Sequence, residues 1–561
     1  MTTDTNLSSA EVVDAIVDHL PTPNPSPTRL SLETRVQLCR ECIESVFDVA
    51  GEWAEVAAVA KGLPQTSDIR TEDLLSGPTV VVRQLQLTVQ TLKTLQTPAA
   101  PELPGRPSRL ANGQVSVPVF PTSGFFDSLT FMGLRGTVRM QQGVDEHSLH
   151  GDRLQCVREG AIDGVSAVLG AGNVSSIPAT DSLNRILFEG RRVLLKLNPV
   201  NDYLAPVFER AFAPLIREKL LTLITGGAEV GSCLIHHDRV TDFHITGSAA
   251  THDAIVWGSN PAEAARRKRD NQPLLLKPVT SELGNVTPWI MVPGQYTTKQ
   301  LHSQAQHLAS SITNNASFNC LATKVILTWN QWSQREEFLK LLQYYLRQTP
   351  LRPAYYPGAA ERFRRFSGHE ISPDDNNCLP WMLLIDQSVD ERPELFQEES
   401  FVCVCAETQL SGQSPAQFLQ QATEFVNQRM TGTLCASVTV PNGFRRQHPD
   451  VMAQVLNDLR YGSVCVNQWA GLAYGLVSPP WGAYPGATLQ NVESGLGNVH
   501  NTYLLDRIEK TILEGPLINF PKPVWFAAHR NSLNVASRLL KLYHQPSIWR
   551  LPPLFAAALR G

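Results

Sequence analysis

Short apolar runs alternate with amphipathic stretches along most of the chain, and this alternation predicts two α/β units. Between about residues 160 and 275 the apolar runs are VSAVLG, RRVLLKLN, LLTLITG and VTDFHITG. Between about residues 283 and 475 they are PWIMV, KVILTW, SFVCVCAE, TLCASVTV and GSVCVN. Strands separated by helical stretches are typical of parallel sheets with crossover helices, a layout that binds nucleotides. We therefore expect an α/β fold with two parallel-sheet domains and extensions at both ends.

The first part of the chain follows a different pattern. Apolar positions at helical spacing predict a long helix over about residues 31–61, after a short acidic helix and a Pro-rich connector at 21–28. The runs TVVVRQLQLTVQ and GQVSVPVFP, between about residues 78 and 140, predict strands that alternate with Gly/Pro breaks.

The charge is nearly balanced overall but uneven at the two ends. The 561 residues carry 52 acidic and 48 basic side chains, a formal net charge of -4, and 42% of them are hydrophobic. This hydrophobic content excludes disorder for most of the chain, and the lack of net positive charge argues against nucleic-acid binding. Residues 1–60 hold ten acids and three bases, whereas residues 515–561 hold six bases and no acid.

The basic C-terminal stretch, residues 515–561, is open to two interpretations. Its bases are interleaved with aromatic side chains, and apolar positions around 531–543 recur at helical spacing. Such a segment suits peripheral contact with an anionic membrane. It also suits an arm that packs on the acidic N-terminal helices or on a partner subunit. We favour packing over membrane contact.

The cysteines and the apolar runs indicate a cytoplasmic protein. No run reaches the roughly 18 uncharged apolar residues of a membrane-spanning helix, and the N-terminus lacks the basic start of a secretory signal. Ten scattered cysteines fit a reducing compartment better than a disulfide framework. Cys39 and Cys42 form a C-x-x-C pair without a second pair nearby, so we expect helix packing there and predict no metal site.

Candidate ligand-binding residues follow three of the predicted strands. Ligands of a parallel sheet bind at the carboxyl ends of its strands, where glycines let the backbone approach a pyrophosphate. A helix that starts there adds N–H groups and a favourable dipole. The residues concerned are Lys196, Gly227, Gly231, Thr246, Gly247 and Ser248. Each stretch alone is equally explained as an ordinary strand end or turn.

Candidate reactive residues lie in two later segments, Glu282-Leu283-Gly284-Asn285 and Asn314-Asn315-Ala-Ser-Phe-Asn319-Cys320. A cysteine attacks a carbonyl as the thiolate, and a nearby carboxylate can act as base toward a thiol or water. Taken singly, Glu282 is equally a surface acid and Cys320 a small buried side chain.

Together and in this order, the segments resemble the aldehyde dehydrogenase superfamily. The resemblance covers about residues 150–510 and extends to Glu399-Ser-Phe401, Gly462-Ser-Val-Cys-Val-Asn467 and Pro480-Trp481-Gly482-Ala-Tyr484. It implies an aldehyde dehydrogenase-like fold with two Rossmann-like domains and an oligomerisation arm, and a homo-oligomer. The domains expected are an N-terminal helical extension (1–110), a nucleotide-binding domain (111–282), a catalytic domain (283–475) and a C-terminal segment with the basic arm (476–561).

The resemblance also implies a covalent mechanism that uses NAD or NADP. Cys320 matches the nucleophile, Glu282 the general base and Asn173 the asparagine that stabilises the oxyanion. The residues implied to bind the cofactor are Lys196, Gly227, Gly231, Thr246, Gly247, Ser248, Leu283, Gly284, Glu399 and Phe401. Phe318, Trp469 and Trp481 line an apolar tunnel in this interpretation, or belong to the core.

Three features depart from the family pattern. Asn285 places a side chain where the backbone is normally bare. Pro199 stands at the position of an acid that binds the ribose 2′-OH, and the absence of this acid leaves NADP permitted. The charged insert Arg266–Asp270 is expected to be a solvated surface loop, with a phosphate or coenzyme A contact as the alternative.

The direction of the reaction stays open at this point. Glu282 favours oxidation of an apolar aldehyde to a carboxylic acid through a thiohemiacetal and a thioester, which is our preferred interpretation. The Gly170-Ala-Gly-Asn173 stretch is similar to fatty-acyl-CoA reductases of the same superfamily, and with Pro199 it favours NADPH-dependent reduction of an acyl thioester to an aldehyde. A non-catalytic relative is a third possibility, against which the presence of Cys320, Glu282 and Asn173 argues.

Overall fold

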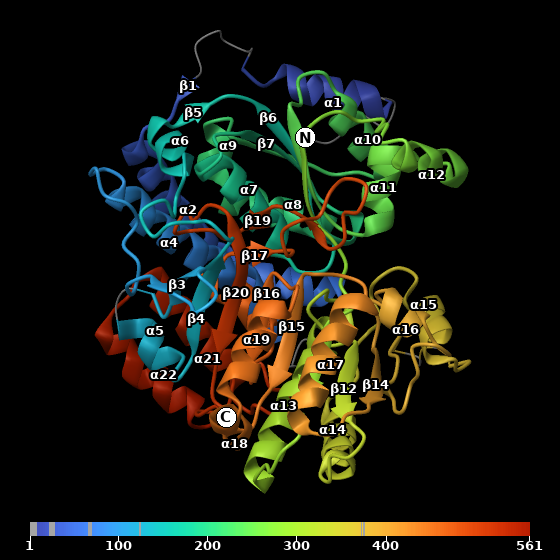
Figure 1. The fold of residues 1–561 in the computed structure, drawn as a ribbon. Helices are drawn as coiled ribbons and strands as arrows, with labels where there is room; N and C mark the ends of the chain where they lie inside the picture. The colour runs from blue at the N-terminus through green and yellow to red at the C-terminus, as the bar shows by residue number, and fades with distance from the viewer. Residues whose placement is uncertain (1–7, 22–27, 65–69, 123–124, 372, 374–375) are drawn as a thin grey trace.

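Two β-sheets, one in each half of the molecule, form the frame of the protein (Figure 1). A computed structural model describes residues 8–21, 28–64, 70–122, 125–371, 373 and 376–561, and all statements on structure refer to these. Most of the predicted Pro-rich connector, residues 22–27, lies outside the described residues. The first sheet has six strands in the order β18-β10-β9-β6-β7-β8. The second has ten, in the order β13-β14-β12-β11-β15-β16-β20-β4-β3-β2.

The four strands predicted between residues 160 and 275 are confirmed and lie next to one another in the six-stranded sheet, from β9 to the edge strand β8. The strands of this sheet are β6 (Val165–Leu169), β7 (Arg192–Lys196), β8 (Leu221–Ile224), β9 (Asp242–Thr246), β10 (Val279–Glu282) and β18 (Gly495–Leu496). All pair in parallel except β18, which pairs antiparallel with β10. The chain runs from β6 to β8 on one side and then crosses to β9 on the other. The strand order therefore reverses at β6 and β9, and ligands of open parallel sheets bind at such a point.

The ten-stranded sheet contains the strands predicted between residues 283 and 475. Its members are β2 (Ser108–Arg109), β3 (Val115–Phe120), β4 (Arg135–Met140), β11 (Pro288–Met291), β12 (Val325–Trp329), β13 (Met382–Leu384), β14 (Val404–Leu410), β15 (Cys435–Thr439), β16 (Ser463–Val466) and β20 (Ile508–Glu514). The strands from β13 to β20 pair in parallel, and the β3–β4 hairpin joins β20 antiparallel. The hairpin at residues 115–140 thus pairs with this second sheet and not with the six-stranded one. The domain boundaries stay predictions.

Helix α4 (Val80–Thr94) replaces the strand that the run TVVVRQLQLTVQ predicted, so that prediction was wrong. Its buried side chains Val81, Val82, Leu85, Val89 and Leu92 recur at helical spacing. They pack against the long helix α2 (Leu32–Ala60), which the sequence predicted correctly. The three consecutive valines favour a strand locally, but this packing outweighs their propensity. The short acidic helix is present as α1 (Ser9–Asp18), and Cys39 and Cys42 are packed inside the protein from α2.

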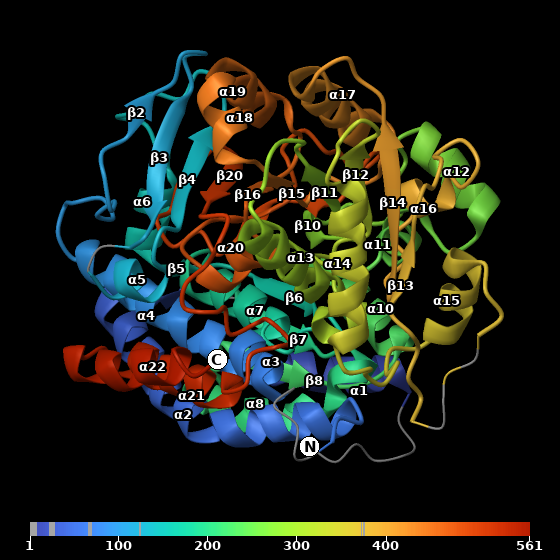
Figure 2. The same cartoon turned by 90° about the horizontal axis from the view of Figure 1, so that it is seen from below.

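The C-terminal helix α21 (Ser532–His544) lies beside the N-terminal helices α2 and α4, and α22 (Leu551–Ala558) packs against α21 (Figure 2). The His544 ring stacks on Phe47 at 3.8 Å, and its Nε2 lies 2.8 Å from the carboxylate of Glu44. Packing on the acidic N-terminal helices is therefore confirmed for α21. Trp549 between the two helices is exposed, and membrane contact through it stays a prediction. Within the described ranges, no helix is both long and apolar enough to cross a membrane.

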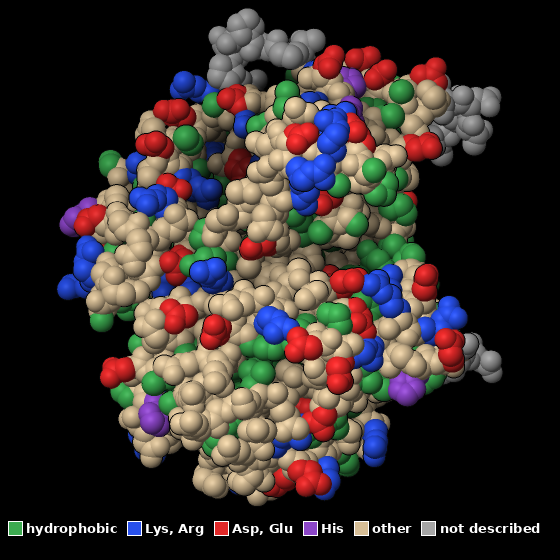
Figure 3. All heavy atoms as spheres, turned by 45° about the vertical axis from the view of Figure 1, so that its right-hand side comes forward, with side chains coloured by type: hydrophobic (Ala, Val, Ile, Leu, Met, Phe, Trp, Pro, Cys, Tyr) green, Lys and Arg blue, Asp and Glu red, His purple; other side chains and the backbone are tan. Residues whose placement is uncertain are grey.

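The charged insert forms a helix, α12 (Pro261–Arg269), and not the expected loop. Asn260 caps its first turn, with Oδ1 accepting from the N–H of Glu263. Arg266 and Arg267 both pair with Glu263, and Lys268 pairs with Asp253. Acidic side chains accordingly lie among the basic ones on this part of the surface (Figure 3). Three of the insert's four basic side chains are thus paired with acids of α12 and of the preceding helix.

Candidate active site

The carboxyl edge of the six-stranded sheet meets the amino edge of the ten-stranded sheet at Glu282 and Cys320. Glu282 is the last residue of β10, and residues 283–287 lead directly from it into β11. Cys320 lies in the loop between helix α13 (Thr298–Thr313) and strand β12. The Cys320 Sγ lies 3.8 Å from the Glu282 Oε1, toward which the thiol donates. The fold therefore brings together the two reactive residues predicted from separate segments.

The surroundings keep this thiol neutral and make the carboxyl group titrate near neutral pH. Burial, and next the negative charge of Asp181, raise the pKa of Glu282 to about 8. Burial, with the nearby carboxylates of Glu282 and Glu399, also raises the pKa of Cys320 well above its usual range. A carboxylate with a pKa near the working pH can take a proton from the thiol or from water.

Two hydrogen-bond donors are available beside the thiol. Asn173, in the loop after β6, donates one amide N–H from Nδ2 to the Phe318 carbonyl at 3.1 Å. No other described group accepts from this Nδ2, so its second N–H is free. The backbone N–H of Cys320 likewise donates to no carbonyl in the described part of the chain. The pair fits an oxyanion that forms next to Sγ.

The loop before Cys320 is held in a strained conformation. Asn315, Ala316 and Ser317 have φ angles of 50°, 54° and 67°. The left-handed region costs roughly 1–2 kcal/mol for each side chain larger than glycine, with asparagine the best tolerated. Lys324 at the start of β12 offsets part of this cost, because its Nζ donates to the Ser317 carbonyl at 3.1 Å and to the Ser317 hydroxyl at 2.8 Å.

Two further hydrogen bonds fix the backbone around the thiol. The Thr287 hydroxyl donates to the Cys320 carbonyl at 2.7 Å, and the Trp469 indole donates to the Leu321 carbonyl at 2.8 Å. Trp469, Trp481 and Phe318 are all buried, so each contributes to the core. The Trp481 side chain lowers the pKa of Glu282 and so opposes part of the rise caused by burial.

The residues predicted after β7, β8 and β9 lie along the carboxyl edge but serve different purposes. Gly227 starts helix α10 (Ala228–His236), and a Cβ added there would meet nothing within 4 Å, so the backbone is open to a ligand. Gly231 is buried one turn further along α10, and the Gly247 N–H donates to the Glu282 carbonyl. The Ser248 hydroxyl caps helix α11 (Ala249–Trp257). Thr246 points inward, with its hydroxyl 3.0 Å from the Asp181 carboxylate.

Lys196 has an acidic neighbour, Asp202, although Pro199 stands at the position of the acid usual in the family. Pro199 begins a short 3-10 helix, Pro199–Leu204, which brings in Asp202. Burial lowers the pKa of Lys196 and the charge of Asp202 raises it, so the two groups interact. The Asp202 Oδ1 is buried and has no hydrogen-bond partner among the described residues. An acid is therefore present near this lysine, although Pro199 occupies the position at which one was expected.

Gly284 and Glu399 form a second unsatisfied position, beside Cys320. A Cβ at Gly284 would lie 2.5 Å from the Glu399 Oε2, so only glycine allows this approach. The Glu399 Oε1 is buried and accepts no hydrogen bond from any described group. Burial raises the pKa of Glu399 to about 7, and the charge of Lys324 opposes this rise. Phe401 packs against the Phe318 ring at 6.0 Å.

The Asn285 side chain is held inside the protein by hydrogen bonds. Its Nδ2 donates to the Cys435 carbonyl at 3.0 Å and to the Thr287 hydroxyl at 2.8 Å. The side chain is buried and fastens the start of β15 to the chain after Leu283. The additional side chain is therefore bonded within the protein interior.

Sequence reasoning missed several polar residues at this site, namely Lys61, Glu72, Asp181, Asp202, Lys324 and Tyr355. Each comes from a segment outside the motifs or from a position within them to which no role was given. Asp202 had one available signal, since it follows Lys196 by six residues. Lys61 and Glu72 had none, because only the packing of α2 brings them near Asn315.

Comparison with known proteins supports the family resemblance. Residues 127–358 match the model of the aldehyde dehydrogenase family. A search of curated proteins finds no match. Among solved structures, an aldehyde dehydrogenase of Mycobacterium tuberculosis complexed with NAD+ is 17% identical with a TM-score of 0.58, covering 90% of each chain. An aldehyde dehydrogenase from Pseudomonas aeruginosa is 15% identical with a TM-score of 0.58, covering 91% of this chain and 88% of its own.

A third solved structure carries a different cofactor. The glyceraldehyde-3-phosphate dehydrogenase from Methanocaldococcus jannaschii, complexed with NADP, is 13% identical with a TM-score of 0.54. The match covers 91% of this chain and 93% of that one. At these identities the structural likeness establishes the fold, and the two α/β halves are those of these enzymes.

Proposed function

We propose that the chain is an enzyme of the aldehyde dehydrogenase family, whose model matches residues 127–358, and that it oxidises an apolar aldehyde to a carboxylic acid through a thioester on Cys320. The observation that carries this proposal is the 3.8 Å contact between the Cys320 thiol and Glu282. A carboxylate at this position can first activate the thiol and later activate water. Both are needed to oxidise an aldehyde and release the acid.

In the first step the Glu282 carboxylate takes the Sγ proton, and the Cys320 thiolate attacks the aldehyde carbon. A carbon–sulfur bond forms, and the carbonyl π electrons move onto oxygen. The free N–H groups of Asn173 and Cys320 would stabilise this oxyanion. One such donor is typically worth about 2.7–4 kcal/mol of barrier.

The second half of the reaction releases the acid. A nicotinamide cofactor would supply the oxidation as the hydride acceptor, and the tetrahedral carbon bonded to Cys320 would then become a thioester. Once Glu282 has lost its proton to solvent, it takes a proton from water as the water oxygen attacks the thioester carbon. The carbon–sulfur bond then breaks, and Cys320 leaves as the thiolate and is reprotonated.

The residues along the carboxyl edge of the six-stranded sheet, together with Glu399 beside Gly284, fit a dinucleotide. The unpartnered Oδ1 of Asp202 and Oε1 of Glu399 can each accept from a ribose hydroxyl, and the bare backbone at Gly227 suits a pyrophosphate. Lys196 beside Asp202 would bind the same ribose. The Asp202 carboxylate supports NAD over NADP, since it would accept from a 2′-OH and repel a 2′-phosphate.

The hydrophobic side chains around Cys320 support an apolar substrate. The thiol packs against a hydrophobic cluster that includes Val174, Ile177, Leu321 and Trp469. An aliphatic or aromatic chain would bury its surface there at a gain of roughly 25 cal/mol for each Å².

Reduction of an acyl thioester to an aldehyde is the second candidate, supported by the Gly170-Ala-Gly-Asn173 stretch. Both directions share the acyl-cysteine, but reduction needs no base to activate water. The test is to incubate the protein with a long-chain aldehyde plus NAD or NADP, and separately with an acyl-CoA plus NADPH, while absorbance at 340 nm is followed. Turnover only in the second assay would contradict the proposed direction, and turnover in neither would contradict the proposed activity.

A further inference from the structure

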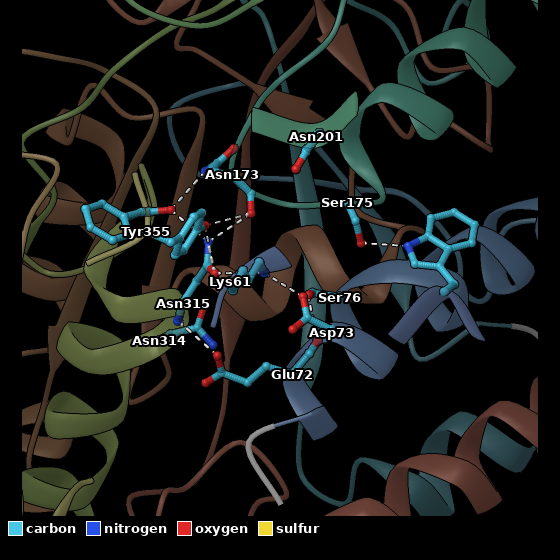
Figure 4. A network of polar contacts seen from close by, with 12 residues as sticks. Lys61, Glu72, Asp73, Ser76, Asn173, Ser175, Asn201, Asn314, Asn315 and Tyr355 are labelled. Carbon is cyan, nitrogen blue, oxygen red and sulfur yellow. Dashed lines mark hydrogen bonds and ion pairs between the residues drawn. The ribbon is translucent and has the colours of Figure 1, made fainter. Parts of the chain in front are cut away.

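A buried polar network connects the N-terminal helices to the loop that carries Cys320 (Figure 4). Lys61 follows the last residue of α2, and Glu72 and Asp73 belong to the short helix α3 (Arg70–Leu74). Asn315, on the other side, is the first of the three left-handed residues before Cys320. Residues more than 240 positions apart in the chain thus converge on one backbone segment.

Lys61 is the centre of this network. Its Nζ lies 2.5 Å from the Asp73 Oδ1 and donates at 3.0 Å to the Asn315 Oδ1. Both members of the ion pair are almost fully buried, with side chains 7% and 2% exposed. The ammonium also lies over the Tyr355 ring, 5.5 Å from its centre.

The charge of Lys61 decides which way the Asn315 amide faces. An ammonium only donates hydrogen bonds, so it requires the amide oxygen on its side. The Tyr355 hydroxyl donates to the same oxygen at 3.1 Å. The amide Nδ2 must then point the opposite way, where it donates at 3.0 Å to the carbonyls of both Asn173 and Phe318.

Those two carbonyls connect the amide to the reaction site. The Phe318 carbonyl also accepts one side-chain N–H of Asn173. This bond orients the amide so that its second N–H can donate to the oxyanion. Phe318 is two residues before Cys320. A reversed or loosened Asn315 amide would thus release the oxyanion donor and the thiol together.

Glu72 holds the backbone of the same residue. Its Oε2 accepts from the Asn315 N–H at 3.0 Å and pairs with Arg352. The left-handed backbone of Asn315 is therefore fixed at its N–H by Glu72 and at its side chain by Lys61.

We propose that Lys61 and Glu72 are positioning residues that hold the strained loop at 315–317, and with it Cys320 and Asn173, in the geometry required for attack on the aldehyde. This inference rests on the proposed function for its meaning in catalysis. Its physical content, that the N-terminal helices keep the loop ordered, is independent of turnover.

The test removes the buried pair as a unit. The double variant Lys61→Met with Asp73→Asn leaves no uncompensated charge, which buried pairs often tolerate with little loss of stability. We expect amide hydrogen exchange at residues 315–320 to become at least about tenfold faster, because the loop loses its tether. We expect kcat to fall at least about tenfold, with the dissociation constant of the nucleotide within about twofold, because the cofactor residues are not touched.

The chain offers a matched control. Arg83 of α4 and Asp127 form another buried pair, with side chains 5% and 4% exposed, and its bonds do not reach the loop. Arg83→Met with Asp127→Asn should leave exchange at 315–320 and kcat as in the parent protein. A folded Lys61/Asp73 variant that behaves like this control would overturn the proposal.

Glu72 gives a second test that does not depend on the tolerance of the buried pair. Glu72→Gln keeps an oxygen for the Asn315 N–H, whereas Glu72→Ala removes it, and both lose the ion pair with Arg352. We expect the alanine variant to lose loop protection and kcat, and the glutamine variant to retain both. Equal values in the two variants would contradict the role of Glu72. Since hydrogen exchange is read without substrate, an absence of turnover in the parent would count against the proposed function and leave this result standing.

Discussion

The two ends of the site differ in how completely their polar groups are bonded. Around the thiol, the Asn315 amide has partners for both its oxygen and its nitrogen, and Lys324 satisfies the Ser317 carbonyl. At the residues assigned to the cofactor, the buried Asp202 Oδ1 and Glu399 Oε1 have no partner among the described residues.

This difference has a physical meaning. The loop before Cys320 is held by a bonded polar network and is therefore rigid, while the free N–H groups of Asn173 and Cys320 are left for the oxyanion. A buried oxygen without a donor costs free energy that a ligand can recover. The chemical end is therefore built to hold a geometry, and the cofactor end is built to receive hydroxyl groups. Changes at the first should alter kcat, and changes at the second should alter nucleotide binding.

The largest effect is expected from the nucleophile. Cys320→Ala removes the atom that forms the acyl intermediate, so kcat should fall by at least about 10⁴-fold. The dissociation constant for nucleotide, measured by fluorescence titration, should stay within about twofold of the parent value. Loss of nucleotide binding together with turnover would mean that Cys320 supports the structure of the cofactor site.

The next effect is expected from the base. Glu282→Gln keeps the shape of the side chain but cannot accept a proton, which should lower kcat by about 10²–10⁴-fold. In the parent protein the active form of Glu282 is the carboxylate, and its pKa is raised to about 8. The rate should therefore fall about tenfold for each pH unit below 8 and level off above it. A pH profile that is flat between 6 and 8 in the parent would contradict this assignment.

A smaller loss is expected from the oxyanion donor. Asn173→Ala leaves the Cys320 N–H as the remaining donor, and kcat should fall by about 10²–10³-fold. Iodoacetamide should still alkylate Cys320, since the thiol and Glu282 are unchanged; mass spectrometry of the Cys320 peptide provides this control. A kcat within threefold of the parent would show that the oxyanion lies elsewhere.

The smallest effect is expected at Asp202, the residue assigned to the ribose of the cofactor. Asp202→Asn removes the charge that would repel a 2′-phosphate, so the preference for NAD over NADP, taken as the ratio of dissociation constants, should fall about tenfold. Glu218→Gln is a suitable control, because it makes the same change of charge at an exposed position on the surface. An unchanged ratio would remove Asp202 from the ribose site.

Most of the fold was predictable because it depends on local pattern. The apolar runs that form β6, β7, β8 and β9 alternate with helices at a spacing that only a parallel sheet explains. Helix α4 was not predicted, since its three consecutive valines favour a strand and only its packing on α2 shows the helical period.

The site was predictable to the extent that its chemistry lies within continuous motifs. Cys320 and Glu282 could be chosen by residue type and order along the chain, and the structure brings them together. The inward turn of Asn285, the approach of Asp202 to Lys196 and the contact of Lys61 with Asn315 depend on how distant segments pack. Apart from the six-residue spacing of Lys196 and Asp202, no pattern along the chain contains that information.

The central claim, that an acyl group forms on Cys320 and leaves with the help of Glu282, has one direct test. The Glu282→Gln variant is mixed with a long-chain aldehyde and NAD, quenched in acid, and digested for mass spectrometry. In this variant solvent can still take the Sγ proton slowly, whereas the water that must attack the thioester has no base. The account therefore predicts that the Cys320 peptide gains the mass of the acyl group, in an amount equal to the NADH formed in the first turnover. A folded, nucleotide-binding variant whose Cys320 peptide stays unmodified while NADH is produced would contradict it.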